Sequence, residues 1–292
     1  TKLLDYGGKK PVLVVPSLIN RAHILDLDKS HSFVRALAKK GFRPLLVDWD
    51  APGPRERHFS LDDYMKRLVK ALNCAVKEAG GPVPVIGYCM GGVFAAALAQ
   101  LAKDKVSKLV FLATPWDFHS GGMEPQVRRA LLDQLGPWME EWGELPGDVI
   151  QAFFVLMQPF AVIEKFCRFK KLLAKSRAVK SFVLLEDWVN DGVPLPKNVA
   201  KACFEGWYEK NLPLKGAWKV MGACIDPATI ACPNLHVIPA RDKIVPPASA
   251  MALARAVPDA EILDPPLGHV SMMGHPHAAT TLWPQIFDWL AS

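Results

Sequence analysis

Short apolar runs alternate with helical patterns along the first third of the chain. Four of these runs are rich in Val, Leu and Ile and have the length of strands that are buried on both faces, as in a parallel sheet. They occupy residues 11–15, 43–49, 82–88 and 108–113. The pattern therefore predicts a mostly parallel β-sheet.

Two segments between these runs carry apolar residues at helical spacing. Residues 31–41 end at Gly41, and residues 60–81 begin with Ser60, a residue type that caps helix N-termini. In the second segment Tyr64, Leu68 and Leu72 fall on one face of a helix. Strands and helices thus alternate, which is typical of an α/β fold with helices flanking the sheet.

The alternation stops after residue 117 and returns near residue 232. Residues 118–231 are mostly helical in pattern, rich in Trp and Phe, and show no clear strands. Beyond them, residues 234–240 and 260–264 predict two strands, and helices are expected at 247–257 and near 280–291. We interpret residues 1–117 and 232–292 as the α/β core and residues 118–231 as an inserted helical lid.

Composition narrows the class of protein. Half of the 292 residues are hydrophobic, but no uninterrupted apolar run reaches the roughly 18 to 20 residues of a membrane span. The 6 cysteines are scattered singly, without the spacing of a zinc site or a disulfide framework. We therefore expect no metal, no integral membrane insertion and a reducing, cytoplasmic setting.

The net charge of +6 is modest, and basic residues gather in residues 166–180. A solvated helix face is favoured there over a site for an anionic ligand or nucleic acid, because no nucleic-acid-binding motif accompanies it. The chain begins at Thr1, close to the first expected strand, with no visible secretory signal. We expect an N-terminal segment to precede it.

Residues 87–92 read GYCMGG and directly follow an apolar run. This glycine spacing is that of a nucleophile elbow, the sharp strand-to-helix turn of α/β-hydrolases, with Cys89 at its centre. An isolated cysteine is more often a small buried hydrophobe. The elbow spacing, with suitable Asp and His residues downstream, favours a nucleophile.

A thiol nucleophile needs a base and an acid that orients the base, because an ordinary thiol is mostly protonated at neutral pH. In α/β-hydrolases these follow the nucleophile in the order acid, base. Asp242 follows the strand expected at 234–240, and His269 follows the strand expected at 260–264. Asp117 is the alternative acid, and His275 and His277 are alternative bases.

The oxyanion of an acyl-transfer intermediate requires backbone N–H donors. Met90, at the start of the elbow helix, is one candidate. Leu18, in the loop after the first long strand, is the second, whereas Pro16 has no N–H to donate.

Several further motifs extend over nearly the whole chain. They include LIN followed by ILDL (residues 18–27), LATPWDF (112–118), the set Trp188, Asp191, Gly192 and Pro196, ARDKIVPP (240–247) and GHVSMMG (268–274). With the elbow, they resemble the catalytic domain of polyhydroxyalkanoate synthases, above all the shorter class III members. The elbow alone also resembles dienelactone hydrolases, which are shorter and lack the long lid.

The resemblance implies an acyltransferase that takes (R)-3-hydroxyacyl-CoA, holds the acyl group on Cys89 as a thioester, and passes it to a hydroxyl of a growing polyester chain. Asp242 and His269 complete the implied catalytic residues. No cofactor is implied beyond the CoA thioester substrate. Class III members work with a second subunit, so a second subunit or a homodimer is open as a partner, and the polyester granule surface as a location.

Two other functions stay open. A cysteine-dependent hydrolase, such as an esterase, thioesterase or polyester depolymerase, would use the same three residues. A non-catalytic granule-associated subunit would keep only the fold. Polymerisation requires that water be excluded, which gives the apolar lid a function; residues 152–160 would line the site, with buried lid core as the favoured alternative.

Overall fold

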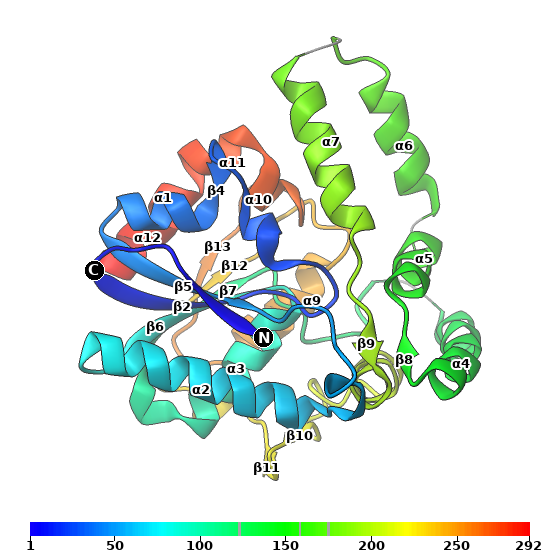
Figure 1. Cartoon of the computed structure of the whole chain (residues 1–292), viewed down its shortest axis with the longest axis horizontal. Coiled ribbons are helices and arrows are strands. Elements are labelled where there is room, and N and C mark those ends of the chain that lie inside the picture. The colour runs from blue at the N-terminus through cyan, green and yellow to red at the C-terminus, as the bar shows by residue number, and fades with distance from the viewer. Residues whose placement is uncertain (122–123, 158, 174–175) are drawn as a thin grey trace.

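The computed structural model describes residues 1–121, 124–157, 159–173 and 176–292. A sheet of 7 strands crosses the molecule in the order β1-β5-β2-β6-β7-β12-β13. All neighbouring strands are parallel except β1, which pairs antiparallel with β5 (Figure 1). The strands are β1 (Lys2–Asp5), β2 (Lys10–Val15), β5 (Phe42–Asp48), β6 (Val83–Tyr88), β7 (Val106–Leu112), β12 (Asn234–Val237) and β13 (Glu261–Leu263).

The predicted α/β fold is confirmed. Strands β2 and β6 are buried along nearly their whole length, as their continuous apolar sequences indicate. Strand β1 was missed, because this short edge strand is mostly exposed and lacks a long apolar run.

Helices cover both faces of the sheet. Helices α2 (Leu61–Ala79) and α3 (Met90–Leu101) pack in the core on one face, and α1 (Phe33–Lys39) and α12 (Trp283–Ala291) on the other (Figure 1). Ser60 precedes α2 as expected, and its backbone N–H donates to Asp63 at 3.0 Å. Helix α3 is almost wholly buried, so the elbow helix is fixed by packing on all sides.

The chain between β7 and β12 is mostly helical, and α6 and α7 project from the body of the molecule (Figure 1). The sequence showed no clear strands here, yet two small antiparallel ribbons are present, β8 with β9 and β10 with β11. Each of these strands has only 2 residues, too few for a recognisable period. The elements are α4 (Pro125–Trp142), β8 (Glu144–Leu145), α5 (Gly147–Met157), α6 (Pro159–Phe169), α7 (Arg177–Asn190), β9 (Leu195–Pro196), α8 (Lys197–Lys201), a π-helix (Ala202–Glu209), β10 (Lys219–Val220) and β11 (Ala223–Cys224).

Shorter elements complete the core. They are β3 (Asp26–Asp28), β4 (His31–Ser32), α9 (Pro247–Ala256), α10 (Ser271–Gly274), α11 (Pro276–Thr281) and 3-10 turns at Ala22–Leu25, Glu56–His58, Lys103–Lys105 and Pro227–Thr229. Cys89, Asp242 and His269 follow β6, β12 and β13, so all three lie at the carboxyl edge of the parallel strands. Across the described ranges, no helix combines the length and the apolar character needed to cross a membrane.

Candidate active site

Cys89 occupies the turn between β6 and α3 in a strained backbone conformation, with φ 54° and ψ −126°. The turn is held from both sides, because the Cys89 N–H donates to the Leu112 carbonyl at 2.8 Å and the Cys89 carbonyl accepts from the Gly92 N–H at 2.9 Å. A non-glycine residue adopts such a backbone only where its surroundings enforce it. The conformation matches the nucleophile elbow predicted from the glycine spacing.

The three glycines around Cys89 are required by close backbone contacts. A Cβ on Gly87 would lie 2.4 Å from the Gly92 Cα, and one on Gly91 would lie 2.2 Å from the Val15 carbonyl oxygen. A Cβ on Gly92 would lie 1.8 Å from Thr114 Oγ1. The spacing of the motif therefore reflects steric exclusion on three sides of the elbow.

Asp242 and His269 form a buried pair. His269 Nδ1 lies 2.7 Å from Asp242 Oδ2, and the two residues are 6% and 5% exposed. The other carboxylate oxygen, Asp242 Oδ1, accepts the backbone N–H groups of Ile244 and Val245, each at 2.8 Å. The carboxylate is thus fixed by its own loop, and it orients the imidazole ring.

Asp242 and Cys89 both affect the pKa of His269. Burial lowers the pKa of His269, but the negative charge of Asp242, the charge of the Cys89 thiolate and hydrogen bonds to both residues raise that pKa by more, so the net direction is upward. The imidazolium form of His269 is therefore stabilised. This arrangement can store the thiol proton on His269 and leave Cys89 as the nucleophile.

Tyr88 supports the imidazole from the preceding position, a role that the sequence did not reveal. Its hydroxyl donates to the His269 carbonyl at 3.3 Å, and the two ring centroids lie 5.2 Å apart. Burial, together with the negative charges of Cys89 and Asp242, holds the pKa of Tyr88 well above its ordinary value. The hydroxyl therefore stays a donor, but only the folded chain brings it to a loop far away in sequence.

The alternative acid and the alternative bases make other hydrogen bonds. Asp117 accepts hydrogen bonds from Ser120 Oγ at 2.6 Å and from Asn211 Nδ2 at 2.7 Å, so it fixes a loop. His275 and His277 are exposed, and His275 Nδ1 accepts the backbone N–H of His277 at 3.2 Å. The structure thus brings together Cys89, Asp242 and His269.

The two oxyanion donors stay a prediction. Met90 is the first residue of α3, so its N–H belongs to the helix end that has no intrahelical acceptor. The Leu18 side chain is buried in the core, while its neighbours Ser17 and Ile19 line a cavity with Cys89. A backbone N–H from this loop is compatible with the second donor position.

Two cavities meet at Cys89. The larger, of about 370 Å³, lies beside Met90 and the loop that carries Asp117, and the smaller, of about 90 Å³, contains His269. Both cavities are bounded by Ile19, Phe154 and Ile244. Of the segment 152–160, Phe153, Phe154 and Leu156 line the larger cavity, and Phe153 is also packed in the core. The side chains of residues 157–160 lie outside the described part.

The described residues include no group of three or more His, Cys, Asp or Glu side chains arranged to hold a metal ion. The polar groups that converge at the carboxyl edge of the sheet are those of a nucleophile, a base and an orienting acid. Their arrangement is suited to acyl transfer through a covalent intermediate.

Comparison with known proteins places this geometry in context. The family described as alpha/beta hydrolase fold matches residues 10–153. The chain is 28% identical to the poly(3-hydroxyalkanoate) polymerase subunit PhaC of Haloferax mediterranei, over 99% of this chain and 61% of that protein. It is 29% identical to the protein of that name from Allochromatium vinosum, over 96% of this chain and 80% of that protein.

The chain thus spans about three fifths of the length of the Haloferax relative, and likewise 60% of a Haloarcula marismortui relative that is 28% identical over 96% of this chain. Solved structures agree on the fold alone. A putative non-heme bromoperoxidase BpoC of Mycobacterium tuberculosis aligns with a TM-score of 0.63 and 19% identity, over 100% of this chain and 97% of that one. A thermophilic esterase of Thermogutta terrifontis aligns with a TM-score of 0.61 and 19% identity, over 99% and 92%.

Proposed function

We propose that this chain, which is similar to poly(3-hydroxyalkanoate) polymerase subunits and has an α/β-hydrolase fold, transfers the acyl group of an (R)-3-hydroxyacyl-CoA to a growing polyester through a thioester on Cys89. The observation that carries the proposal is the buried His269–Asp242 pair, with Nδ1 and Oδ2 2.7 Å apart, beside a cysteine on a strained elbow. This is the arrangement that acyl transfer by a covalent route needs.

The first half-reaction loads the enzyme. The Cys89 thiolate attacks the thioester carbonyl, the carbon–sulfur bond to CoA breaks, and His269 gives its proton to the departing CoA sulfur. One thioester replaces another, so this step is nearly balanced in free energy and the acyl group stays activated. The backbone N–H groups of Met90 and Leu18 are the proposed donors to the oxyanion.

The second half-reaction forms the ester. The hydroxyl of another hydroxyacyl unit attacks the acyl-Cys89 carbonyl while His269 accepts the hydroxyl proton, and Cys89 leaves as a thiolate. An oxygen ester forms at the expense of a thioester, which is downhill. Sulfur therefore suits both half-reactions, because the Cys89 thiol accepts the acyl group from CoA and then donates it to an alcohol.

Hydrolysis is the second candidate, and the lining of the larger cavity favours it. Asp117, His119 and Ser120 lie on the wall of this cavity, and such polar groups can hold water near the acyl-enzyme. Apolar residues that line the same cavity, such as Phe153 and Phe154, favour exclusion of water instead. Whether water reaches the acyl-enzyme decides between polyester and free hydroxy acid.

The proposal is tested by incubating the protein with (R)-3-hydroxybutyryl-CoA and identifying the products. We expect CoA release together with insoluble polyester, and a covalent adduct on Cys89 in the intact mass. Cys89→Ala abolishes both, whereas Cys74→Ala, which removes an exposed cysteine on α2, leaves both unchanged. CoA release with free hydroxy acid and no polyester would contradict synthesis and support hydrolysis. The absence of any adduct on Cys89 would support a non-catalytic subunit.

Three of the compared proteins are named as subunits of a polymerase. We therefore include a second subunit or a second copy of this chain in the proposal, acting in the cytoplasm at the surface of the polyester. The dependence of specific activity on protein concentration, measured together with light scattering, tests for the second copy.

A further inference from the structure

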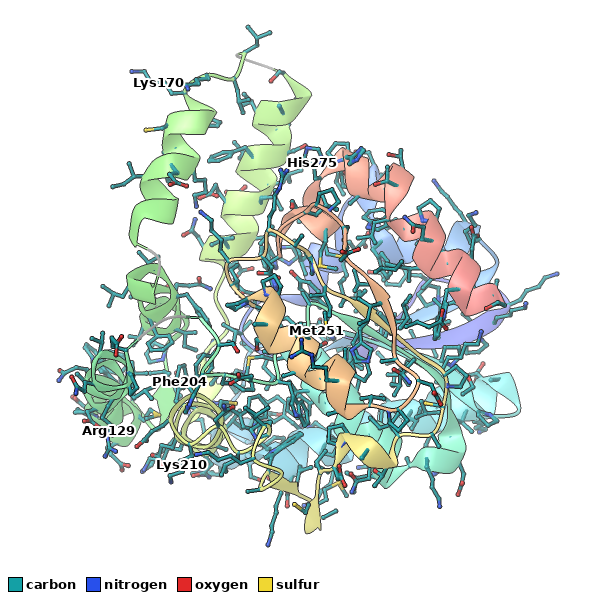
Figure 2. The ribbon with its side chains drawn as sticks, turned by 180° about the vertical axis from the view of Figure 1, so that it is seen from behind. Arg129, Lys170, Phe204, Lys210, Met251 and His275 are labelled. Atoms are coloured by element: carbon teal, nitrogen blue, oxygen red, sulfur yellow. The ribbon has the colours of Figure 1, made fainter. Side chains whose placement is uncertain are left out.

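The hairpin of α6 and α7 ends in a strongly basic tip. Residues 165–180 read KFCRFKKLLAKSRAVK, in which seven residues are Lys or Arg and none is Asp or Glu. The hairpin projects beyond the body of the molecule (Figure 1), and Lys170 lies near its end (Figure 2). None of the proposed catalytic residues lies in this segment.

Large apolar side chains lie exposed among these basic residues. Ile163 is 62% exposed, Phe166 49% and Leu173 82%. Their burial against an apolar phase would be favourable, since transfer of apolar surface out of water is the main driving force of association. A solvated helix face, which the charge pattern alone favoured, does not account for this exposed apolar surface.

We infer that the tip of the α6–α7 hairpin docks on an anionic phospholipid surface. Phe166 and Leu173 enter the boundary between headgroups and acyl chains, and Lys170 and Lys171 contact the phosphates. Lysine suits this position, because its long apolar stem lies along the interface while the ammonium stays hydrated. Nucleic acid would satisfy the charges but leave the apolar side chains in water.

Sedimentation with vesicles tests the inference on the whole chain, without reference to its reaction. The wild type is expected to bind vesicles of phosphatidylcholine with phosphatidylglycerol and to bind phosphatidylcholine alone only weakly, with affinity falling as salt rises. A lysine near an anionic surface contributes about fivefold in affinity, so K170E/K171E should weaken binding by at least about thirtyfold. Leu173→Asp should weaken it about tenfold.

Two matched substitutions serve as controls. Lys210, far from the hairpin tip in Figure 2, and Leu214 are exposed, and Lys210→Glu and Leu214→Asp should leave vesicle binding unchanged. Wild-type failure to bind anionic vesicles overturns the inference, as does equal loss in tip and control variants. Tip variants that lose only binding to lipid-free polyester particles, or to an acidic protein, overturn it as well.

A second, independent observation concerns Gln151 in α5. Its side chain lines the small cavity that contains Cys89 and His269, and its amide Nε2 is buried without a hydrogen-bond partner among the described residues. A buried donor left unpaired carries a free-energy penalty. Around it the cavity is mostly apolar, with Phe154 and Val189 on its wall.

We propose that Gln151 Nε2 donates a hydrogen bond to the 3-hydroxyl oxygen of the acyl unit on Cys89. The inference rests on the proposed function and names the group that selects 3-hydroxyacyl over plain acyl substrates. A site built to bond a hydroxyl rejects the analogue without it, because its own polar group is then left unpaired. The residue acts on substrate choice and leaves the thiol chemistry to Cys89.

Acylation rates with two CoA esters test the assignment. We measure kcat/KM for loading of Cys89 from (R)-3-hydroxybutyryl-CoA and from butyryl-CoA, which lacks the hydroxyl. Gln151→Leu should lower the preference for the hydroxyacyl ester by about tenfold or more and leave the butyryl rate unchanged. Gln134→Leu, at an exposed position of α4, is the matched control and should keep the wild-type preference.

The outcomes separate this inference from the function on which it rests. If neither ester acylates Cys89 in the wild type, the proposed function fails. If both esters acylate the wild type and Gln151→Leu keeps the wild-type preference, only the assignment of Gln151 fails. An equal fall of both rates in Gln151→Leu would show a merely structural role and would also overturn it.

Discussion

The elbow in the sheet and helix α4 of the insertion differ in how closely other atoms approach their glycines. Around the elbow, backbone atoms approach so closely that a Cβ on Gly87, Gly91 or Gly92 would lie 2.4 Å or less from a neighbouring atom. In the insertion, a Cβ on Gly136 of α4 would meet nothing within 4 Å. Large apolar side chains there reach solvent, among them Val127, Trp138, Trp142, Val155, Leu156, Ile163, Phe166, Leu173 and Val183.

This difference indicates that the elbow and the insertion have different functions. A close-packed elbow keeps the nucleophile within reach of His269, and close packing tolerates almost no change of volume. The insertion shapes the cavities and the exposed surface, so substitutions there should alter substrates and partners more than chemistry. The predictions below test this division, from the largest expected effect to the smallest.

Replacing the sulfur should have the largest effect. Cys89→Ser keeps the size of the side chain and the elbow, so the fold should persist, but polyester formation should fall about a thousandfold or more because an alcohol is a poor match for thioester exchange. Polymer mass and circular dichroism measure the two effects. Undiminished polymer synthesis would show that sulfur is not essential.

Asp242→Asn should have the second largest effect on activity. The amide keeps the shape of the carboxylate but loses the charge that raises the pKa of His269, and it can favour the wrong imidazole tautomer. Acylation of Cys89 should slow by about a thousandfold. Asp117→Asn, in the alternative acid, should retain acylation within about threefold, and the reverse order of the two effects would transfer the role to Asp117.

Gly91→Ala tests the packing of the elbow directly. The new methyl group would lie 2.2 Å from the Val15 carbonyl oxygen, and because the backbone cannot yield easily, unfolding in urea should show a loss of about 2–3 kcal/mol with reduced acylation. Wild-type stability in this variant would mean that the elbow is less tightly packed than the structure shows.

The pH dependence of stability should report the buried pair. The raised pKa of His269 means that the folded state favours the imidazolium, so this stabilisation is complete below the ordinary pKa of about 6.5 and is lost as the pH rises through the folded value. The difference in free energy of unfolding between wild type and His269→Gln should shrink as the pH rises. In Cys89→Ala, which removes one of the charges that raise the pKa of His269, the decline should still begin near the ordinary pKa but should be smaller and end at a lower pH.

Gly136→Ala should have the smallest effect. Beyond its chain neighbours the new methyl group meets nothing within 4 Å, and alanine favours a helix over glycine by about 1 kcal/mol. Pro137 follows, however, and disfavours the helical backbone in a preceding residue that carries a Cβ. The two effects oppose each other, so we expect thermal or urea unfolding to change by about 0.5 kcal/mol or less, with acylation unchanged. A loss as large as that of Gly91→Ala would indicate that α4 is packed as tightly as the elbow.

Much of the fold was predictable because its signals are local. The buried strands β2, β5, β6 and β7 are continuous apolar runs, and the helix after Ser60 has a capping residue and one apolar face. Strand β1 and the ribbons β8–β9 and β10–β11 were missed, because strands of 2 to 4 residues are too short to show a period.

The sequence by itself determined the elbow, since its glycines, its cysteine and its preceding strand are neighbours along the chain. It also offered Asp242 and His269, each at the end of a predicted strand. The choice of Asp242 over Asp117 needed the tertiary structure, because only the packing of the sheet sets the 2.7 Å contact between loops 27 residues apart.

Tertiary structure also decided what the side chains of the insertion do. Gln151 in α5 faces the Cys89 cavity and Phe166 in α6 faces solvent, although both belong to helical stretches of similar apolar character. A helix has several faces, and its own sequence does not state which of them meets the core. That is settled by the surfaces against which the helix packs, and these are assembled from residues far apart in the chain.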